Sequence, residues 1–376
     1  MRILVLLAWA LCCAAQEDDP AAGIRPLIEA GNAGFMRGDY PAARQSFEKA
    51  WDLALQTAPD NPLRYDVLKR LTSVRAAAGE FADADRYLQI AMDWRETIVG
   101  PDDPKMVDDM LVSVGLSRGM KDYTRALAIL GRVMARHARD LGFGSTALAD
   151  DFSREAQIYV EREDPESAAR SLTTALRYRT QSAGALDVSL VYDLDRLGGV
   201  YLTLRAYDKA EEAFRHALVI RETLFGREHG DLIASLDGLC YSLFGQKKYA
   251  EAEPLYQRLL ALWIKSVGKE HPMVAIALDK IAVFYADQKK YDQAKEASGR
   301  ANAIRAYSLA TGLSVEAAEQ IGEGNKERAT ALMERALVVL DPPDPVYDEL
   351  RAQTEKIVKS LDPKVQPKTP PPKKKP

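Results

Sequence analysis

The chain of 376 residues repeats its own pattern about every 42 residues over most of its length. An aromatic or turn residue recurs at nearly constant spacing, at Tyr40, Phe81, Tyr123, Pro165, Tyr207, Tyr249 and Tyr291. An alanine stands three places after each of them, at Ala43, Ala84, Ala126, Ala168, Ala210, Ala252 and Ala294. A fixed period of this length predicts an array of small structural units that pack on their neighbours, in place of one or two compact domains.

Each unit is predicted to be a hairpin of two helices. In the second helix, Phe214 and Ala217 follow Ala210 at spacings of four and three, which places all three residues on one helical face. The first helix is marked by another series, Leu68, Met110, Phe152, Leu194, Leu236 and Leu278. The repeated alanines agree with this, because two helices in close contact leave room for only a methyl group. Long Val, Ile and Thr runs of the strand type are missing, so the predicted fold class is all-α.

The pattern divides the chain into five parts. The tail has five lysines, six prolines and a single aliphatic residue, so it is predicted to be disordered. An amphipathic helix before the tail would cover the last apolar face of the array. The parts are a leader at 1–15, a lead-in at 16–26, an array of seven units and a shorter eighth at 27–340, a capping helix at 341–362 and the tail at 363–376.

The leader is predicted to be a signal peptide. Arg2 supplies a positive start, residues 3–11 form an apolar run, and Ala15 is a small residue suited to cleavage before Gln16. The apolar run is too short to span a bilayer, and no later segment could span one either. We therefore expect an exported protein that is periplasmic or secreted.

Cysteines give an alternative for the leader and little else. Cys12 or Cys13 could carry a lipid anchor, but the residues before them do not match a lipoprotein signal. Removal of the leader would leave Cys240 alone, so no internal disulfide is expected. Cys240 occupies a small-residue position of a first helix and is predicted to be a packing residue.

The segment LGGVYLTLRAYDKAEEAFRHAL, residues 197–218, resembles the tetratricopeptide repeat (TPR). The usual unit of that family has about 34 residues. The longer period, with YAEAEPLYQRLLALWIKSVGKEHPMVA at 249–275, is similar to the version in kinesin light chains and related bacterial proteins. The resemblance implies a right-handed α-α superhelix whose first helices line a concave groove, and it implies binding of a protein or peptide without a cofactor.

The groove positions implied by the resemblance are rich in basic residues. Guanidinium groups match carboxylates, so an acidic peptide or a C-terminal carboxylate is one predicted partner. The alternative is that the cations pair with acids of neighbouring repeats, such as Asp195, Asp237 and Asp279. Lys69, Arg70 and Arg154 have no acid at the matching position of their own helix and are the preferred candidates. The candidate binding residues are Lys69, Arg70, Ser73, Arg154, Tyr192, Arg196, Tyr241, Phe244 and Lys280.

The aromatic candidates have two interpretations. Tyr192, Tyr241 and Phe244 would anchor partner side chains if they are exposed on the groove. They would belong to the core between helices if the register differs by one residue. The sequence does not decide between these interpretations.

No motif indicates catalysis or a metal. His229 and His271 occupy the same loop position in successive units and could be two metal ligands, but no third or fourth ligand accompanies them, so a role in ordering the loop is preferred. The net charge of −4 gives no basic field for nucleic acid. The leading prediction is therefore an exported protein-binding scaffold without enzymatic activity. The alternatives are a structural or regulatory subunit of an envelope complex that uses its convex face and basic tail, and, third, an envelope hydrolase.

Overall fold

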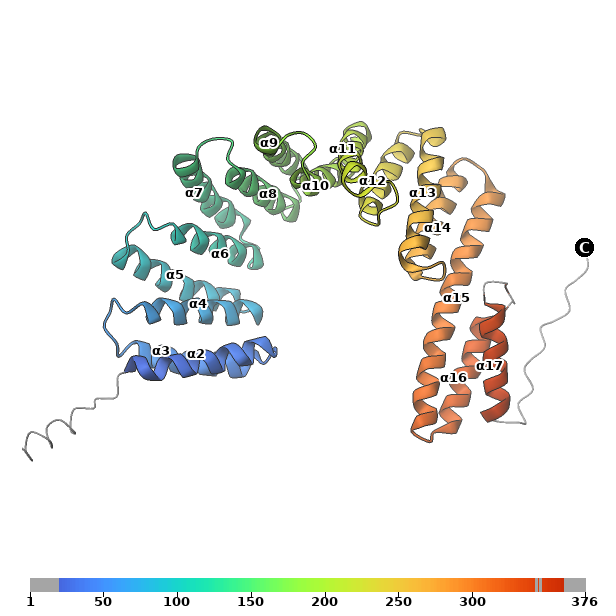
Figure 1. Cartoon of the computed structure of the whole chain (residues 1–376), viewed down its shortest axis with the longest axis horizontal. Helices are drawn as coiled ribbons and strands as arrows, with labels where there is room; N and C mark the ends of the chain where they lie inside the picture. Colours follow the sequence, from blue (N-terminus) through green and yellow to red (C-terminus); the bar gives the residue numbers. More distant parts are fainter. Residues whose placement is uncertain (1–19, 342–343, 345–346, 362–376) are drawn as a thin grey trace, which may run out of the picture. The chain divides into compact units, whose positions relative to one another are not determined.

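The computed structural model describes residues 20–341, 344 and 347–361 (Figure 1). The predicted leader at 1–15 and the predicted tail at 363–376 lie outside these residues. All regular structure in the described part of the chain is helical, in sixteen helices labelled α2 to α17. The prediction of an all-α fold made of successive hairpins is confirmed.

The chain divides into two units, each built from hairpins of neighbouring helices. Unit 1 comprises residues 1–185, and its first helices are α2, α4, α6 and α8. Within it, each second helix packs against the first helix before it and the first helix after it. The helices are α2 (Pro20–Met36), α3 (Tyr40–Ala54), α4 (Pro62–Ala77), α5 (Phe81–Ile98), α6 (Lys105–Gly119), α7 (Tyr123–Leu141), α8 (Thr146–Glu161) and α9 (Pro165–Ala183).

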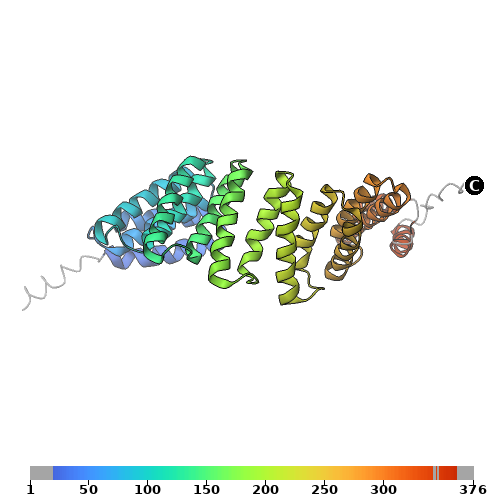
Figure 2. The same cartoon turned by 90° about the horizontal axis from the view of Figure 1, so that it is seen from above.

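Unit 2 comprises residues 186–376, and its first helices are α10, α12 and α14. The hairpins within each unit follow one another side by side (Figure 2). The helices are α10 (Ser189–Thr203), α11 (Tyr207–Phe225), α12 (Leu232–Gly245), α13 (Tyr249–Val267), α14 (Pro272–Asp287), α15 (Tyr291–Gly322), α16 (Lys326–Val339) and α17 (Asp348–Leu361).

The alanine series lies at the helix contacts, as its repetition predicts. Six of the seven alanines, from Ala43 to Ala252, have no exposed surface. Ala294 is half-buried against the core of unit 2. Large side chains of the second helices, such as Leu130 and Phe214, are buried beside these alanines. The repeat period therefore specifies the core of both units.

Glycines in the left-handed region end the second helices. Gly142, Gly184, Gly226 and Gly268 follow α7, α9, α11 and α13, with φ between 80° and 92°. Glycine adopts this conformation without the clash of a Cβ atom and so permits the chain to turn toward the next first helix.

The eighth unit differs from the prediction because its first helix is not separate. Helix α15 continues for 32 residues, and its second half packs with α16. The residue 42 places after Gly268 is Ala310, which is buried within α15. Alanine favours the helix and does not favour the left-handed turn, so the helix runs through this position.

The ends of the array also differ from the expected boundaries. Helix α2 begins at Pro20, so part of the expected lead-in at 16–26 is helical. Helix α17 lies within the range expected for a capping helix, 341–362, and buries Thr354 and Val358 against α15 and α16. None of the helices within the described ranges is long and apolar enough to cross a bilayer.

Candidate functional site

The predicted binding residues lie on first helices in both units. Unit 1 holds Lys69, Arg70 and Ser73 on α4 and Arg154 on α8. Unit 2 holds the remaining candidates on α10, α12 and α14, and these are Tyr192, Arg196, Tyr241, Phe244 and Lys280. The surface formed by the exposed sides of the first helices of a unit is called its first-helix face below.

Lys69 belongs to a buried cluster around Asp109. Its Nζ lies 2.7 Å from Oδ1 of Asp109, a carboxylate on α6 that is almost completely buried. Tyr65 donates its hydroxyl hydrogen to the same carboxylate at 2.7 Å, and Arg95 Nε donates to Oδ2 at 3.1 Å. Burial raises the pKa of Tyr65, and its hydrogen bond to Asp109 raises that pKa further. Lys69 thus joins two hairpins of unit 1 and is not free to bind a partner's carboxylate.

The preference for Arg70 and Arg154 as unpaired cations is wrong. Arg70 donates to Asn32 Oδ1 at 2.6 Å and pairs with Asp66 at 3.4 Å. Arg154 pairs with the buried Asp151 at 3.0 Å. Both acids stand one turn earlier on the same helix, where spacings of three and four bring side chains together. Ser73 donates its hydroxyl to the carbonyl oxygen of Lys69 at 2.9 Å.

The unit 2 candidates separate into exposed and packed residues. Tyr192 and Tyr241 are 66% and 51% exposed, as a binding face requires. Phe244 is half-buried against the core, with its ring 6.3 Å from that of Phe284. Arg196 lies over the Tyr192 ring at 5.3 Å, and Lys280 pairs with Asp237 at 2.6 Å. The alternative of pairing within the array therefore holds for Lys280.

A repeated set of cations lies near the end of each second helix. The members stand 42 residues apart and are called the cation series: Arg95, His137, Arg179, Arg221, Trp263 and Arg305. Trp263 is the one member that carries no charge and cannot acquire one. Arg179 pairs with Asp150 at 2.7 Å, and Arg305 pairs with Asp279.

A matching set of buried positions on the first helices receives the cation series. These positions, called the acid series, are Asp109, Asp151, Asp193, Ser235 and Ala277. Arg95 contacts Asp109, His137 Nδ1 lies 2.6 Å from Asp151, and Arg221 donates to Ser235. Burial raises the pKa of Asp151, while His137 and Arg154 oppose that rise.

Both series change character in the same layer. Where the cation becomes Trp263, the position 14 residues later becomes Ala277, which is also apolar. An ion pair of the kind formed by Arg95 and Asp109 is therefore absent between α13 and α14. The largest hollow of the described surface that we characterise, about 660 Å³, lies in this layer.

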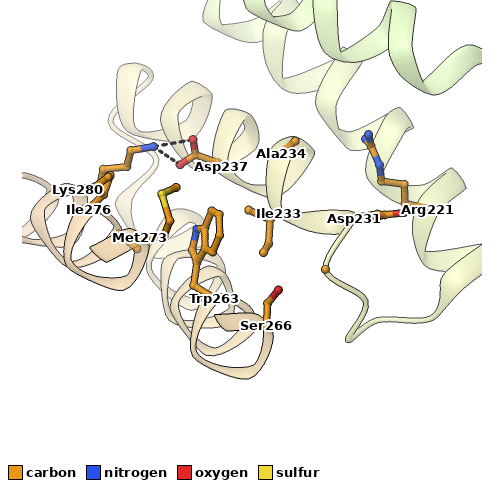
Figure 3. Close-up of a pocket in the computed structure, with 12 residues that line it drawn as sticks. Arg221, Asp231, Ile233, Ala234, Asp237, Trp263, Ser266, Met273, Ile276 and Lys280 are labelled. Carbon is orange, nitrogen blue, oxygen red and sulfur yellow. Dashed lines mark hydrogen bonds and ion pairs between the residues drawn. The ribbon is translucent and has the colours of Figure 1, made fainter. Parts of the chain in front are cut away.

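This hollow, called the Trp263 pocket, is formed by residues of α11 to α14 and the loop before α12. Figure 3 shows the Trp263 indole in its centre, flanked by Met273 and Ile233, with the ion pair of Lys280 and Asp237 at one side. It opens on the first-helix face of unit 2, where Ile276 is exposed. Its lining residues are Arg221, Gly230, Asp231, Ile233, Ala234, Asp237, Trp263, Ser266, Met273, Ile276, Ala277 and Lys280.

Charged groups at the pocket are mostly neutralised. Arg221, whose side chain is only 15% exposed, lies 2.6 Å from Asp195, and Ser235 donates to the same carboxylate at 2.6 Å. Lys280 is paired with Asp237. Asp231 remains 60% exposed, and its ion pair is with His229 at 3.7 Å, which requires a protonated imidazole. The pocket thus combines apolar walls with two closed ion pairs and one open carboxylate.

Of the pocket's lining residues, the sequence analysis named only Lys280 as a binding candidate. Trp263, Met273 and Ile233 were missed because the search followed residues that match the repeat. The available signal was the opposite one, a charged position that turns apolar in one unit together with its partner position.

Unit 1 has a second, more apolar hollow of about 510 Å³. Phe143 stands at its edge between Gly142 and Gly144, both in the left-handed region, and is 86% exposed. Its walls include Met134, Phe152 and Tyr178. It lacks the polar side chains that orient a ligand in the Trp263 pocket, apart from Arg139.

The histidine and cysteine candidates have structural roles. His229 Nδ1 accepts a hydrogen bond from the amide of Asp231, and His271 Nδ1 accepts one from the amide of Met273. Each ring therefore orders the start of the following first helix. Cys240 is completely buried in the unit 2 core, and this burial raises the pKa of its thiol.

Two family models described as the tetratricopeptide repeat match the chain, one over residues 194–231 and the other over residues 232–306. The chain carries tetratricopeptide repeats. The second model covers α12 to α14 and most of the Trp263 pocket. No curated protein sequence matches the chain.

Solved structures with similar folds include three TPR proteins. The C-terminal part of a TPR repeat-containing protein from Cytophaga hutchinsonii is 16% identical, with a TM-score of 0.52, covering 74% of this chain and 95% of that one. A STAND signal transduction ATPase with a tetratricopeptide repeat sensor, from Pyrococcus horikoshii, is 16% identical, with a TM-score of 0.54, covering 75% of this chain and 42% of that one. Repeats of a putative kinesin light chain from Podosopora anserina are 18% identical, with a TM-score of 0.49, covering 55% and 98%. At such identities the similarity concerns the fold.

Proposed function

We propose that this TPR protein is a scaffold that binds a protein or peptide partner on the first-helix face of unit 2, with the Trp263 pocket as the anchoring point. Protein binding is the general role of TPR scaffolds. The observation that carries the proposal is the joint replacement of a charged pair by Trp263 and Ala277, which leaves an open apolar pocket beside exposed Tyr241 and Ile276. Pockets of this kind, with apolar walls and few polar groups, commonly hold ligands.

Site-specific crosslinking in cells tests the working surface. A photoreactive amino acid in place of Ile276 should capture a partner, and this capture should disappear in the Trp263→Ala background. The control position is Val219, an equally exposed residue on the second helix α11. Capture from Val219 and not from Ile276 would support the alternative, in which the protein acts through its second helices.

We also propose that the scaffold is exported, on the basis of the signal-peptide pattern at 1–15. N-terminal sequencing of the protein from its native cells should give a mature chain that begins at Gln16. A chain that retains residue 1 contradicts export by cleavage, and incorporation of labelled fatty acid that requires Cys12 or Cys13 favours the lipid anchor.

A further inference from the structure

We infer that the Trp263 pocket selects a peptide segment in which an apolar side chain stands next to a basic one, and that it disfavours acidic segments. This inference rests on the proposed function and names the chemistry of its partner. It reverses the expectation that basic groove residues bind carboxylates.

The apolar half of the inference follows from the pocket walls. Trp263, Met273 and Ile233 approach the hollow from three elements, α13, α14 and α12. Each is half-buried, so each keeps apolar surface exposed to solvent that a partner side chain would cover. The volume of about 660 Å³ is enough for one large side chain and part of its neighbours.

The pocket's cations do not favour an acidic partner. Arg221 already contacts Asp195 and Ser235, and Lys280 already contacts both carboxylate oxygens of Asp237. A partner carboxylate that took either cation would leave an aspartate of the protein without its own cation. The exchange therefore gains no ion pair and disturbs one that is already formed.

Uncompensated charge at the pocket mouth is negative. The four charged lining residues are Arg221, Lys280, Asp231 and Asp237, and Asp195 neutralises Arg221 from outside the lining. These five groups carry two positive and three negative charges at neutral pH, and Asp231 is the exposed one. A basic side chain would pair with Asp231, and the Trp263 ring offers a second favourable contact for a cation.

A matched variant comes from the repeat itself. Trp263→Arg with Ala277→Ser copies the layer formed by Arg221, Asp195 and Ser235, because Asp237 stands where Asp195 stands one unit earlier. The double variant should fold, as judged by circular dichroism, and should lack the pocket. Trp263→Ala serves as a second variant that empties the pocket without adding charge.

The experiment is a selection of dodecapeptides from a randomised display library against the whole chain, followed by removal of peptides that also bind the double variant. The remaining peptides should combine an aromatic or large aliphatic residue with Lys or Arg within two positions. A chosen peptide should lose affinity roughly three- to tenfold in Asp231→Asn and when its basic residue becomes Gln, and it should lose more when that residue becomes Glu. Asp292→Asn, which removes an exposed carboxylate outside the pocket lining, should leave affinity unchanged.

The outcomes separate this inference from the proposed function. Enrichment of Asp or Glu beside the apolar residue, or equal affinity for the Lys, Gln and Glu peptides, overturns the inference and leaves the scaffold proposal standing. Failure of any peptide to survive the subtraction also overturns it. The scaffold proposal fails only if crosslinking at Ile276 also captures nothing that depends on Trp263.

Discussion

The ring of Phe214 on α11 packs directly against the backbone of Gly198 on α10. A Cβ atom on Gly198 would lie 2.6 Å from Cζ of this ring, closer than atoms can approach without movement. On its other side the same ring meets Gly238 of α12, where a Cβ atom would lie 2.4 Å away. Phe214 therefore fills the space between two first helices of unit 2, and the absence of two side chains creates that space.

Adjacent glycines on α10 give a matched pair of substitutions. Gly198→Ala should reduce the free energy of unfolding by about 1–3 kcal/mol, because the methyl group displaces Phe214. Gly199→Ala should increase it by about 0.5–1 kcal/mol, since nothing lies within 4 Å of a Cβ atom there and alanine favours a helix over glycine. Urea denaturation followed by circular dichroism measures both. Equal effects of the two substitutions would show that the close packing of Phe214 does not matter.

The fold follows from the sequence where a single repeated residue type has a single physical cause. Ala210 and Phe214 could be assigned to the core because their spacing fixes one face of a helix. The break in the pattern at Ala310 was equally readable, but the search for an eighth unit assumed the turn that Gly268 makes one period earlier. Prediction failed there because absence of a turn residue was not weighed.

The candidate site could be predicted less well because its contacts cross between hairpins. Lys69 finds Asp109 on the next first helix, 40 residues away, and a comparison along a single helix does not reveal that pair. The exposure of Tyr241 and the half-burial of Phe244, three residues apart, depend on the exact helix rotation. A comparison of paired positions between units would have located Trp263 and Ala277.

The buried cluster around Asp109 gives a second prediction. Asp109→Asn should destabilise unit 1 by about 3–5 kcal/mol, because Arg95 and Lys69 would lose their shared carboxylate and Arg95 is almost completely buried. The measurement is urea denaturation with fluorescence of Trp94, which lies in the same unit. As the control, Asp66→Asn breaks the more exposed pair with Arg70 and should change stability by less than about 1 kcal/mol. Similar losses from both would contradict the importance of burial.

The turns inside the hairpins give a third prediction. Gly38 and Gly79 occupy the left-handed region in the first two hairpins, whereas Lys121 and Glu163 occupy it in the next two, with φ of 60° and 62°. A side chain with a Cβ atom costs about 1–2 kcal/mol in this conformation, part of which glycine returns as entropy of the unfolded chain. Lys121→Gly and Glu163→Gly should therefore each raise stability by about 0.5–1 kcal/mol.

The reverse substitution completes that test. Gly38→Ala should lower stability by about 1 kcal/mol, although nothing lies within 4 Å of a Cβ atom there, because the backbone conformation alone opposes alanine. Thermal unfolding of the three variants beside the wild type measures the effects. Stabilisation by alanine at position 38 would show that the turn relaxes to another conformation.

Acid sensitivity gives the fourth prediction, at the turn between α4 and α5. A hydrogen bond from Arg75 lowers the pKa of Glu80, with further attraction from Arg75 and Arg44. A carboxyl group whose pKa is lower in the folded chain contributes stability that is present above its unfolded pKa of about 4.3 and is lost as pH falls through the folded value. Glu80→Gln should therefore lower the melting temperature at pH 7 and lose this difference from the wild type between about pH 5 and pH 3. Glu29→Gln, at an exposed position of α2, should parallel the wild type at every pH, and a constant offset for Glu80→Gln down to pH 3 would show that the interaction with Arg75 does not depend on ionisation of Glu80.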